Sequence, residues 1–240
     1  MTRFFGAAVT VITLIPEGLF WMPASFMLAA AVLAAVCYML GSVNLAVILS
    51  RKIKGQDVRE HGSGNAGTTN MLRTFGWTSA ALTFGGDIIK GAISVVLCRA
   101  VFVYLGYEAY AAYGGYLGGI ASLLGQMYPV YFGFKGGKGV ASAIGAMGAI
   151  NPLLCLAVFS VGLLLAVVTG YVSMGSVLCA VAYPFLVLAL MTIGGGTFDL
   201  TELILVFSLA GMLLLSHKDN IKRLLNGTEN KFTPRRNKEQ

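Results

Sequence analysis

Charged side chains are scarce in this sequence. They make up 11% of its 240 residues, whereas a soluble domain carries roughly 25%. Hydrophobic residues make up 57%, and the mean hydropathy is +0.78. So few charges cannot cover a soluble globule of this length, which excludes an ordinary soluble enzyme. The high apolar content also excludes a disordered chain, so the composition predicts an integral membrane protein.

Cysteine is also scarce, and its spacing excludes two further classes of protein. The four cysteines stand singly within apolar runs, at Cys37, Cys98, Cys155 and Cys179. No Cys-x-x-Cys or Cys/His cluster is present, so neither a disulfide framework nor a zinc site is supported. We expect the protein to use no cofactor and no metal.

Long apolar runs, by contrast, are abundant. Seven of them lie at about residues 25–49, 78–98, 109–131, 138–150, 152–169, 173–193 and 201–216. The fourth run has about 13 residues and is short for a span, which needs about 20 residues. The sequence also has 31 glycines. The pairs Gly115–Gly119 and Ala141–Gly145 have the small-xxx-small spacing that lets helices approach closely. We predict an all-α polytopic membrane protein with about seven transmembrane helices.

Basic residues are divided unequally between the connections. If the seven spans alternate in direction, 14 of the 17 lysines and arginines fall on one side of the membrane. Cytoplasmic loops are enriched in these residues. The N-terminal end of the first span is therefore expected outside and the C-terminus in the cytoplasm. The same rule explains the net charge of +7 better than a nucleic-acid partner, and we expect no nucleic acid to bind.

We divide the chain into three parts: an apolar N-terminal extension (1–24), the seven-span domain (25–232) and a basic cytoplasmic tail (233–240). Residues 4–15 are apolar but too few to span a membrane. For them we favour an interfacial or membrane-dipping segment over a signal-like region or an extension of the first helix. The tail is expected at the membrane surface.

The first polar loop has the composition of an anion-binding site. It runs from His61 to Asn70 as HGSGNAGTTN, and Arg73 follows. Glycines allow backbone N–H groups to converge on an anion, and arginine offers a fork of donors to phosphate. Gly62–Gly67 also matches G-x-G-x-x-G, but no strand precedes it, so we reject a dinucleotide site. The alternative is a flexible connection without a ligand.

A second glycine cluster, GFKGGKG, occupies Gly133–Gly139. Lys138 stands where a helix is expected to begin, and helix N-termini bind phosphate through free N–H groups. The cluster is not a Walker A motif, because its spacing is short and Gly139 replaces the serine or threonine that would hold magnesium. The alternative is a basic turn at the membrane edge. Two such clusters on one membrane face favour a site for two anions.

A third polar group, His217-Lys-Asp-Asn220, ends the last span. His217 and Asn220 share a face if the helix continues, and histidine is the common general base near neutral pH. The alternative is a helix end that offsets its own dipole. Asp87 and Lys90 stand i, i+3 inside the second span, where we expect a structural ion pair that supports the site. Ser173 lies on the same side as these motifs.

Together the three motifs resemble the signature motifs of the bacterial acyl-phosphate:glycerol-3-phosphate acyltransferase family. The resemblance runs from about Gly41 to Glu229 and includes Asp87-Ile-Ile-Lys-Gly91 and Met127-Tyr-Pro129. The family has seven spans and an active site that faces the cytoplasm, which agrees with the topology expected from charge. Two positions depart from the family pattern: Gln126 stands where many members have histidine, and Asp219 where we expect glutamate.

The resemblance implies that an acyl group passes from acyl phosphate to the sn-1 hydroxyl of glycerol-3-phosphate in the bacterial inner membrane. The products would be lysophosphatidic acid and phosphate, in the first acylation step of phospholipid synthesis. The implied partners are the two substrates and membrane lipids, and the oligomeric state, monomer included, is left open. The implied phosphate ligands are Ser63, Arg73 and Lys138. The implied remainder of the pocket is Asn65, Thr69, Asn70, Ser173, His217 and Asn220, with Gly136, Gly137 and Gly139 as the glycerol-3-phosphate loop.

Acyl phosphate is already activated, so direct transfer is the mechanism that we expect. Ser63, His217 and Asn220 are the candidate catalytic residues, and the base is either His217 or a phosphate oxygen of a substrate. One rival class is a transporter of a phosphorylated solute, which predicts an internal repeat that the motifs do not show. Another is a scaffold for anionic lipid, which does not explain the first polar loop.

Overall fold

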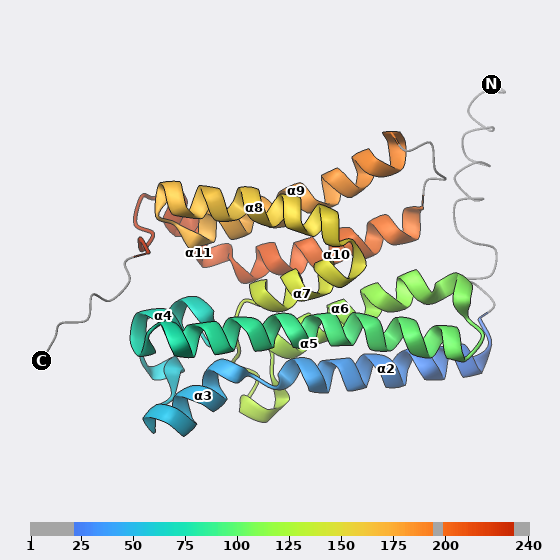
Figure 1. The fold of residues 1–240 in the computed structure, drawn as a ribbon, viewed down its shortest axis with the longest axis horizontal. Coiled ribbons are helices and arrows are strands. Elements are labelled where there is room, and N and C mark those ends of the chain that lie inside the picture. The colour runs from blue at the N-terminus through green and yellow to red at the C-terminus, as the bar shows by residue number, and fades with distance from the viewer. Residues whose placement is uncertain (1–21, 194–198, 233–240) are drawn as a thin grey trace, which may run out of the picture.

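The computed structural model describes residues 22–193 and 199–232, and within these ranges it is helical, without strands (Figure 1). The proposed interfacial segment 4–15 and the tail 233–240 lie outside the described residues. Each of the seven apolar runs forms helix. The long helices are α2 (Ala24–Ser42), α5 (Trp77–Tyr104), α6 (Ala111–Met127), α8 (Pro152–Thr169), α9 (Val172–Ile193) and α10 (Leu200–Ser216). The shorter ones are α3 (Leu45–Lys54), α4 (Thr68–Phe75), α7 (Val140–Ile150) and α11 (Lys218–Leu225), with 3₁₀ turns η2 (Val58–Glu60), η3 (Glu108–Tyr110) and η4 (Val130–Phe132).

Two helices are broken at points where the sequence shows no break. The run at 25–49 is not one helix, because α2 ends at Ser42 and α3 begins after Asn44, whose side chain accepts a hydrogen bond from Val47 N at 3.1 Å. The helix that carries His217 does not continue straight either: α10 and α11 meet there at 61°. His217 and Asn220 therefore do not share the face of one straight helix.

Three helical segments of the described chain are long and apolar enough to cross a membrane: Ala24–Lys54, Pro152–Thr169 and Val172–Ile193. The bent pair α10–α11 makes a fourth if it is counted as one span. Helix α7 is apolar but has only 11 residues. The structure confirms an all-helical chain, and the count of seven spans remains a proposal.

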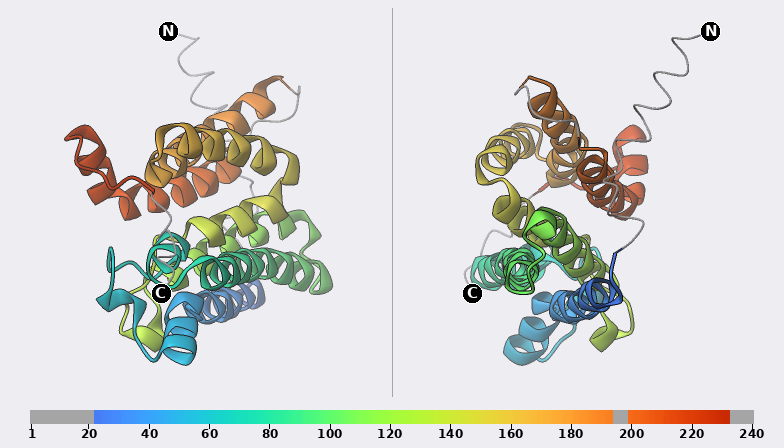
Figure 2. Two further views of the ribbon diagram at one scale, coloured as in Figure 1. Left: turned by 60° about the vertical axis from the view of Figure 1, so that its left-hand side comes forward. Right: turned by 90° about the vertical axis from the view of Figure 1, so that its right-hand side faces the viewer.

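The helices form two groups that meet at α6 and α7 (Figures 1 and 2). One group contains α2 and α5, and the other contains α8, α9 and α10. Glycines set the closest approaches: a Cβ atom on Gly145 of α7 would lie 1.9 Å from Ile88 O of α5, and one on Gly41 of α2 would lie 2.1 Å from Ser122 O of α6. These contacts bear out the prediction of tight, glycine-mediated packing.

Candidate active site

The polar motifs meet at one end of the bundle, where α4 and α11 lie (Figure 1). Three contacts join them. Ala66 O of the first loop would lie 2.4 Å from a Cβ on Gly137, so the two glycine clusters touch. Lys138 donates a hydrogen bond to Asn220 Oδ1 of α11, and Arg73 donates one to Asn230 O at 3.4 Å. The structure thus brings together the three motifs that the sequence separates.

Asn70 holds the first loop in shape. Its Oδ1 accepts a hydrogen bond from Ser63 N at 2.9 Å, and its Nδ2 donates to Val58 O at 3.0 Å and to His61 O at 2.9 Å. The residue is 1% exposed. Both amide hydrogens are therefore used inside the loop, so the geometry favours a structural role for Asn70 over the substrate contact predicted for it.

A charged cluster that the sequence analysis missed ties the first loop to the second. Arg59 Nη1 donates to Phe132 O at 2.7 Å and to Lys135 O at 3.0 Å, just before the glycine loop. Asp57 holds this guanidinium through Nη2 at 2.8 Å, and that hydrogen bonding keeps the pKa of the Asp57 carboxyl well below its usual range. The sequence did not reveal this role of Arg59, because the basic residues between 51 and 59 also fit a cytoplasmic loop.

The backbone of the second glycine cluster is fixed to the end of α6. Gly137 N donates to Gln126 O at 3.0 Å, and Gly136 N donates to Met127 O at 3.1 Å. Gly139 has φ = 81° and caps α7, which begins at Val140. Lys138 therefore stands at the start of a helix, as predicted.

For the glycerol-3-phosphate that the sequence resemblance implies as a substrate, Gly137→Ala is expected to lower the affinity at least about tenfold while the protein stays folded. The added Cβ would lie 2.4 Å from Ala66 O and 3.1 Å from Gln126 Nε2. A backbone carbonyl cannot rotate away, so the loop that presents Lys138 must shift. The measurement is KM in purified protein. Gly85→Ala is the control, since nothing lies within 4 Å of a Cβ there; equal KM values for both variants would contradict the prediction.

Glu229 links the side chains around Lys138. Its Oε1 accepts hydrogen bonds from Asn220 Nδ2 at 2.7 Å and from Ser173 Oγ at 2.8 Å. Its Oε2 accepts one from Arg223 Nε at 2.7 Å. These donors are of the kinds that bind phosphate oxygens. The sequence analysis did not assign Glu229 a role, although an acidic side chain in a predominantly basic C-terminal segment was a signal.

The electrostatics of this cluster follow from partial burial among mixed charges. Burial lowers the pKa of Lys138 to about 8; Glu229 opposes that shift, and Arg223 and Arg73 add to it. The pKa of Glu229 is lowered: burial acts to raise it, but the hydrogen bonds from Asn220, Arg223 and Ser173 together outweigh burial. Near neutral pH the cluster therefore holds a protonated lysine beside an ionised carboxylate.

His217 is buried, with 3% of its surface exposed. Its Nδ1 lies 2.8 Å from Leu213 O. A carbonyl oxygen only accepts, so we assign the ring proton to Nδ1 and the lone pair to Nε2. Burial lowers the pKa of His217 to about 4; the contact with Leu213 O opposes this, and the charge of Lys138 adds to it. The imidazole is neutral at physiological pH.

A buried ionic group supports the glycine loop from inside the bundle. Lys90 Nζ lies 2.9 Å from Asp87 Oδ1, which confirms the predicted ion pair. It also donates to Gly41 O at 3.0 Å, to Val43 O at 2.8 Å and to Gln126 Oε1. Gln126 Nε2 in turn donates to Asp87 Oδ2 at 3.1 Å. Gln126, noted only as a departure from the family pattern, thus joins the ion pair to the glycine loop.

Three of the predicted site residues are not drawn into these contacts. Ser63 is exposed, and Asn65 and Thr69 are half-buried. Among the described residues, none of their side chains hydrogen-bonds to the glycine loop or to α11. They lie in the loop that touches Gly137 through Ala66, and a substrate role for them stays a prediction.

The helices and this cluster define a class: a helical membrane protein with lysine, arginine, serine and asparagine side chains, of the kinds that bind phosphate, gathered at one end of its bundle. A sequence model of glycerol-3-phosphate acyltransferase matches residues 31–227, and the chain belongs to that family. The glycerol-3-phosphate acyltransferase of Clostridioides difficile (strain 630) is 38% identical over 204 residues, which cover 84% of this chain and 94% of the relative. That of Chlorobaculum parvum is 35% identical over 227 residues, covering 86% and 98%.

Two solved structures have the same fold. Both are crystal structures of PlsY, described as an integral membrane glycerol 3-phosphate acyltransferase. Its glycerol 3-phosphate form superposes with a TM-score of 0.72 at 33% identity, covering 85% of this chain and 96% of that one. Its lysophosphatidic acid form gives a TM-score of 0.70 at 32% identity over the same shares.

Proposed function

We propose that this protein acylates the sn-1 hydroxyl of glycerol-3-phosphate with acyl phosphate as the donor, giving lysophosphatidic acid and phosphate. The observation that carries the proposal is that Lys138, in its glycine loop, hydrogen-bonds to Asn220, and that Asn220 shares the Glu229 carboxylate with Ser173 and Arg223. Both proposed substrates carry a phosphate, whose oxygens would take the place of the Glu229 carboxylate on these donors. The structures of the relative with glycerol 3-phosphate and with lysophosphatidic acid support the acceptor and the product.

The reaction that we propose is a direct transfer. The sn-1 oxygen attacks the acyl carbonyl carbon, the bond between that carbon and the phosphate oxygen breaks, and inorganic phosphate leaves with the electron pair. Holding both substrates in line supplies about 7–11 kcal/mol of barrier reduction. Lys138 and the N–H groups near it would stabilise charge on the leaving phosphate.

The hydroxyl proton must reach a base, and we propose that a substrate phosphate oxygen accepts it. The pKa of His217 is about 4 in the free protein, whereas the second pKa of a phosphate monoester is about 6. The phosphate dianion is the stronger base of the two. His217 then acts as a neutral group at the α10–α11 junction, where its Nδ1 donates to Leu213 O at 2.8 Å and the neighbouring Ser216 Oγ lies 3.1 Å from Lys138 O.

Replacing His217 separates the two candidate bases. His217→Ala should lower kcat by about 100-fold or more by either route, since it also removes the contact of the ring with Leu213 O, which then keeps only the hydroxyl of Ser216. His217→Asn retains a donor for Leu213 O but lacks Nε2, so we expect it to keep at least ten times the activity of the alanine variant. If both variants are equally inactive and folded, His217 is the base and the phosphate route is wrong.

The activity itself is tested with purified protein, glycerol-3-phosphate and each acyl donor in turn. We expect lysophosphatidate from acyl phosphate and none from acyl-CoA, with the acyl group on the sn-1 oxygen by product analysis. If only acyl-CoA gave product, acyl phosphate would not be the donor. If no donor gave product, the assignment as an acyltransferase would be wrong.

We further propose seven spans in the bacterial inner membrane with the site on the cytoplasmic side. The support is the distribution of lysine and arginine, of which 14 of 17 fall on the side of the motifs. A thiol-accessibility experiment on single cysteines introduced at Lys135 and at Glu108, both exposed, would place these two loops on opposite sides.

A further inference from the structure

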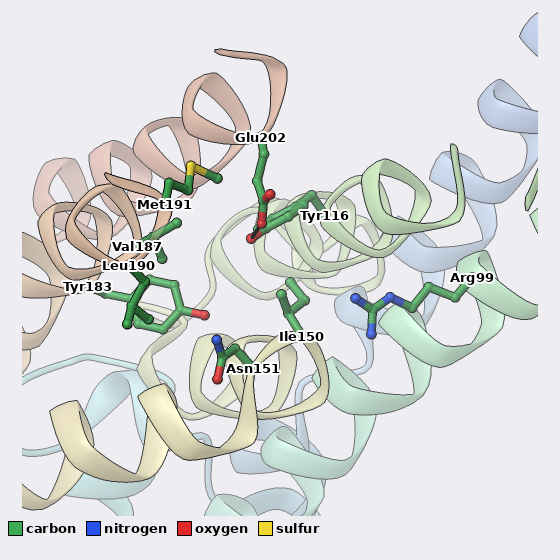
Figure 3. Close-up of a pocket in the computed structure, with 9 residues that line it drawn as sticks. All are labelled: Arg99, Tyr116, Ile150, Asn151, Tyr183, Val187, Leu190, Met191 and Glu202. Atoms are coloured by element: carbon green, nitrogen blue, oxygen red, sulfur yellow. Dashed lines mark hydrogen bonds between the residues drawn. The ribbon is translucent and has the colours of Figure 1, made fainter. Parts of the chain in front are cut away.

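A polar cavity lies at the other end of the bundle from the candidate active site. It has a volume of about 290 Å³ and lies where α5, α6, the α7–α8 turn, α9 and α10 meet (Figure 3). Arg99 stands near the C-terminal end of α5 and Tyr116 near the N-terminal end of α6, whereas the glycine loop follows the opposite end of α6. The polar side chains that line it are Arg99, Tyr116, Asn151, Tyr183 and Glu202. The proposed reaction uses none of them.

Opposite charges reach this cavity from separate helices. Arg99 donates one hydrogen bond through Nη1 to Ala149 O at 3.0 Å, and Glu202 Oε1 accepts one from the Tyr116 hydroxyl at 2.8 Å. In the described part of the chain, no salt bridge joins Arg99 to Glu202. Each group therefore keeps hydrogen-bonding capacity for a ligand with two charges.

The hydroxyl of Tyr183 is the strongest sign that something occupies the cavity. Tyr183 is 2% exposed, and its hydroxyl has no hydrogen-bond partner within the described residues. Figure 3 shows the hydroxyl pointing into the cavity from α9. A buried hydroxyl without a partner is destabilising, and such groups are rare. The position is explained if a polar ligand accepts or donates a hydrogen bond there.

Exposed apolar side chains of α9 stand at one edge of the cavity. Leu190, which lines it, is 53% exposed, and Ile193 one turn further along α9 is 83% exposed. In a membrane protein such a surface faces lipid. The volume also far exceeds the roughly 15 Å³ that one water needs. The cavity thus combines a dipolar interior with an entrance suited to an acyl chain.

We propose that this cavity binds the headgroup of a phospholipid with a phosphate and a primary amine, that is, phosphoethanolamine. Arg99 pairs with the phosphate, as guanidinium groups do. Glu202 accepts hydrogen bonds from the ammonium group, and Tyr183 and Asn151 satisfy the remaining phosphate or ester oxygens. The acyl chains leave past Leu190. The site is a lipid site separate from the substrate pocket.

Native mass spectrometry of the full chain in detergent tests the proposal with three lipids of equal chains: dioleoyl phosphatidylethanolamine, phosphatidylglycerol and phosphatidylcholine. We expect the ethanolamine lipid to be retained about tenfold better than the other two, which lack a primary amine. Glu202→Gln should abolish this preference, because the amide still accepts from Tyr116 but carries no charge. Glu108→Gln, which removes an exposed carboxylate outside the cavity, should preserve it. Equal retention of the three lipids, or an unchanged preference in Glu202→Gln, would overturn the proposal.

Tyr183→Phe gives a second readout that does not depend on folding defects. Retention of phosphatidylethanolamine should fall about two- to tenfold, the range of one neutral hydrogen bond. Without lipid the variant should unfold at the same or a higher temperature than the parent, because it loses an unpartnered hydroxyl. A lower unfolding temperature with unchanged lipid retention would refute the role of Tyr183. Acyl transfer in detergent without added lipid should be unchanged in each of these variants, so failure here and failure of the proposed function are distinguishable.

Discussion

Lys138→Met will lower kcat/KM for glycerol-3-phosphate by about 100- to 1,000-fold, the effect of removing one preorganised donor at a site of developing charge. Lys138 is held at the start of α7 and hydrogen-bonded to Asn220. Methionine keeps the length and the packing of the side chain but removes the cation. The measurement is steady-state kinetics in detergent with acyl phosphate.

The matched control for this variant is Lys135→Met. Lys135 belongs to the same loop and carries the same charge, but its side chain is exposed. We expect its kcat/KM to stay within about threefold of the parent, since exposed charges contribute little. Equal losses in the two variants would mean that the loop acts through its overall charge and not through Lys138.

The pKa of Lys138 also predicts that kcat/KM falls at alkaline pH. The pKa of Lys138 is about 8, so the ammonium form that binds phosphate is complete below pH 8 and is lost as the pH rises through that value. For the free enzyme, kcat/KM should therefore fall about tenfold per pH unit above pH 8. In Lys138→Arg this fall of kcat/KM above pH 8 should disappear, whatever the absolute rate, because a guanidinium stays protonated to about pH 12. An identical fall of kcat/KM above pH 8 in both proteins would contradict the assignment of this pH dependence to Lys138.

Lys90→Met will have the largest effect on stability. It leaves the Asp87 carboxylate, which is 2% exposed, without its partner, and it removes the donor to Gly41 O and Val43 O. Breaking a buried pair from one side costs about 3–5 kcal/mol. We expect little folded protein, measured as the monodisperse fraction in gel filtration and as the midpoint of thermal unfolding.

The double variant Asp87→Asn with Lys90→Met separates the cost of the orphaned charge from the loss of packing. Once neither side chain is ionised, the penalty for a buried unpaired carboxylate disappears. The double variant should therefore be more stable than Lys90→Met alone. If it is equally unstable, the backbone contacts of Lys90 matter and its pairing with Asp87 does not.

The helices and the motifs were accessible from sequence because each depends on local pattern. Apolar runs define the helices, and the three motifs stand out as polar segments between them. The breaks at Asn44 and His217 were not foreseen, since no proline interrupts either run. Asn44 caps α3 and the chain bends by 61° at His217. Long-range contacts lie at both breaks: Asn44 Nδ2 donates to Ala66 O at 3.4 Å, and Ser216 Oγ lies 3.1 Å from Lys138 O.

The connections between motifs were hidden for a different reason. Gln126, Glu229 and Arg59 each have at least one partner 36 or more residues away: Gln126 and Lys90 are separated by 36 positions, Glu229 and Ser173 by 56, and Arg59 and Phe132 by 73. A single sequence does not show such pairings. Asn70 shows the converse, because its amide looks like a ligand in the sequence and serves its own loop in the structure.

The placement of Asp87 and Lys90 on one helix also bears on how the chain enters a membrane. Gln126 and the carbonyls of the α2–α3 break complete the polar cage of Lys90 only when α6 is in place. If α5 is one of the seven proposed spans, it must be inserted before that with two ionisable groups near its centre, and isolated charges at that depth are costly. Because the two groups stand one turn apart, 2.9 Å from each other, the helix supplies its own counter-ion. The pair can cross the membrane boundary as a neutral unit and exchange its hydration for the carbonyls of α2 as the bundle assembles.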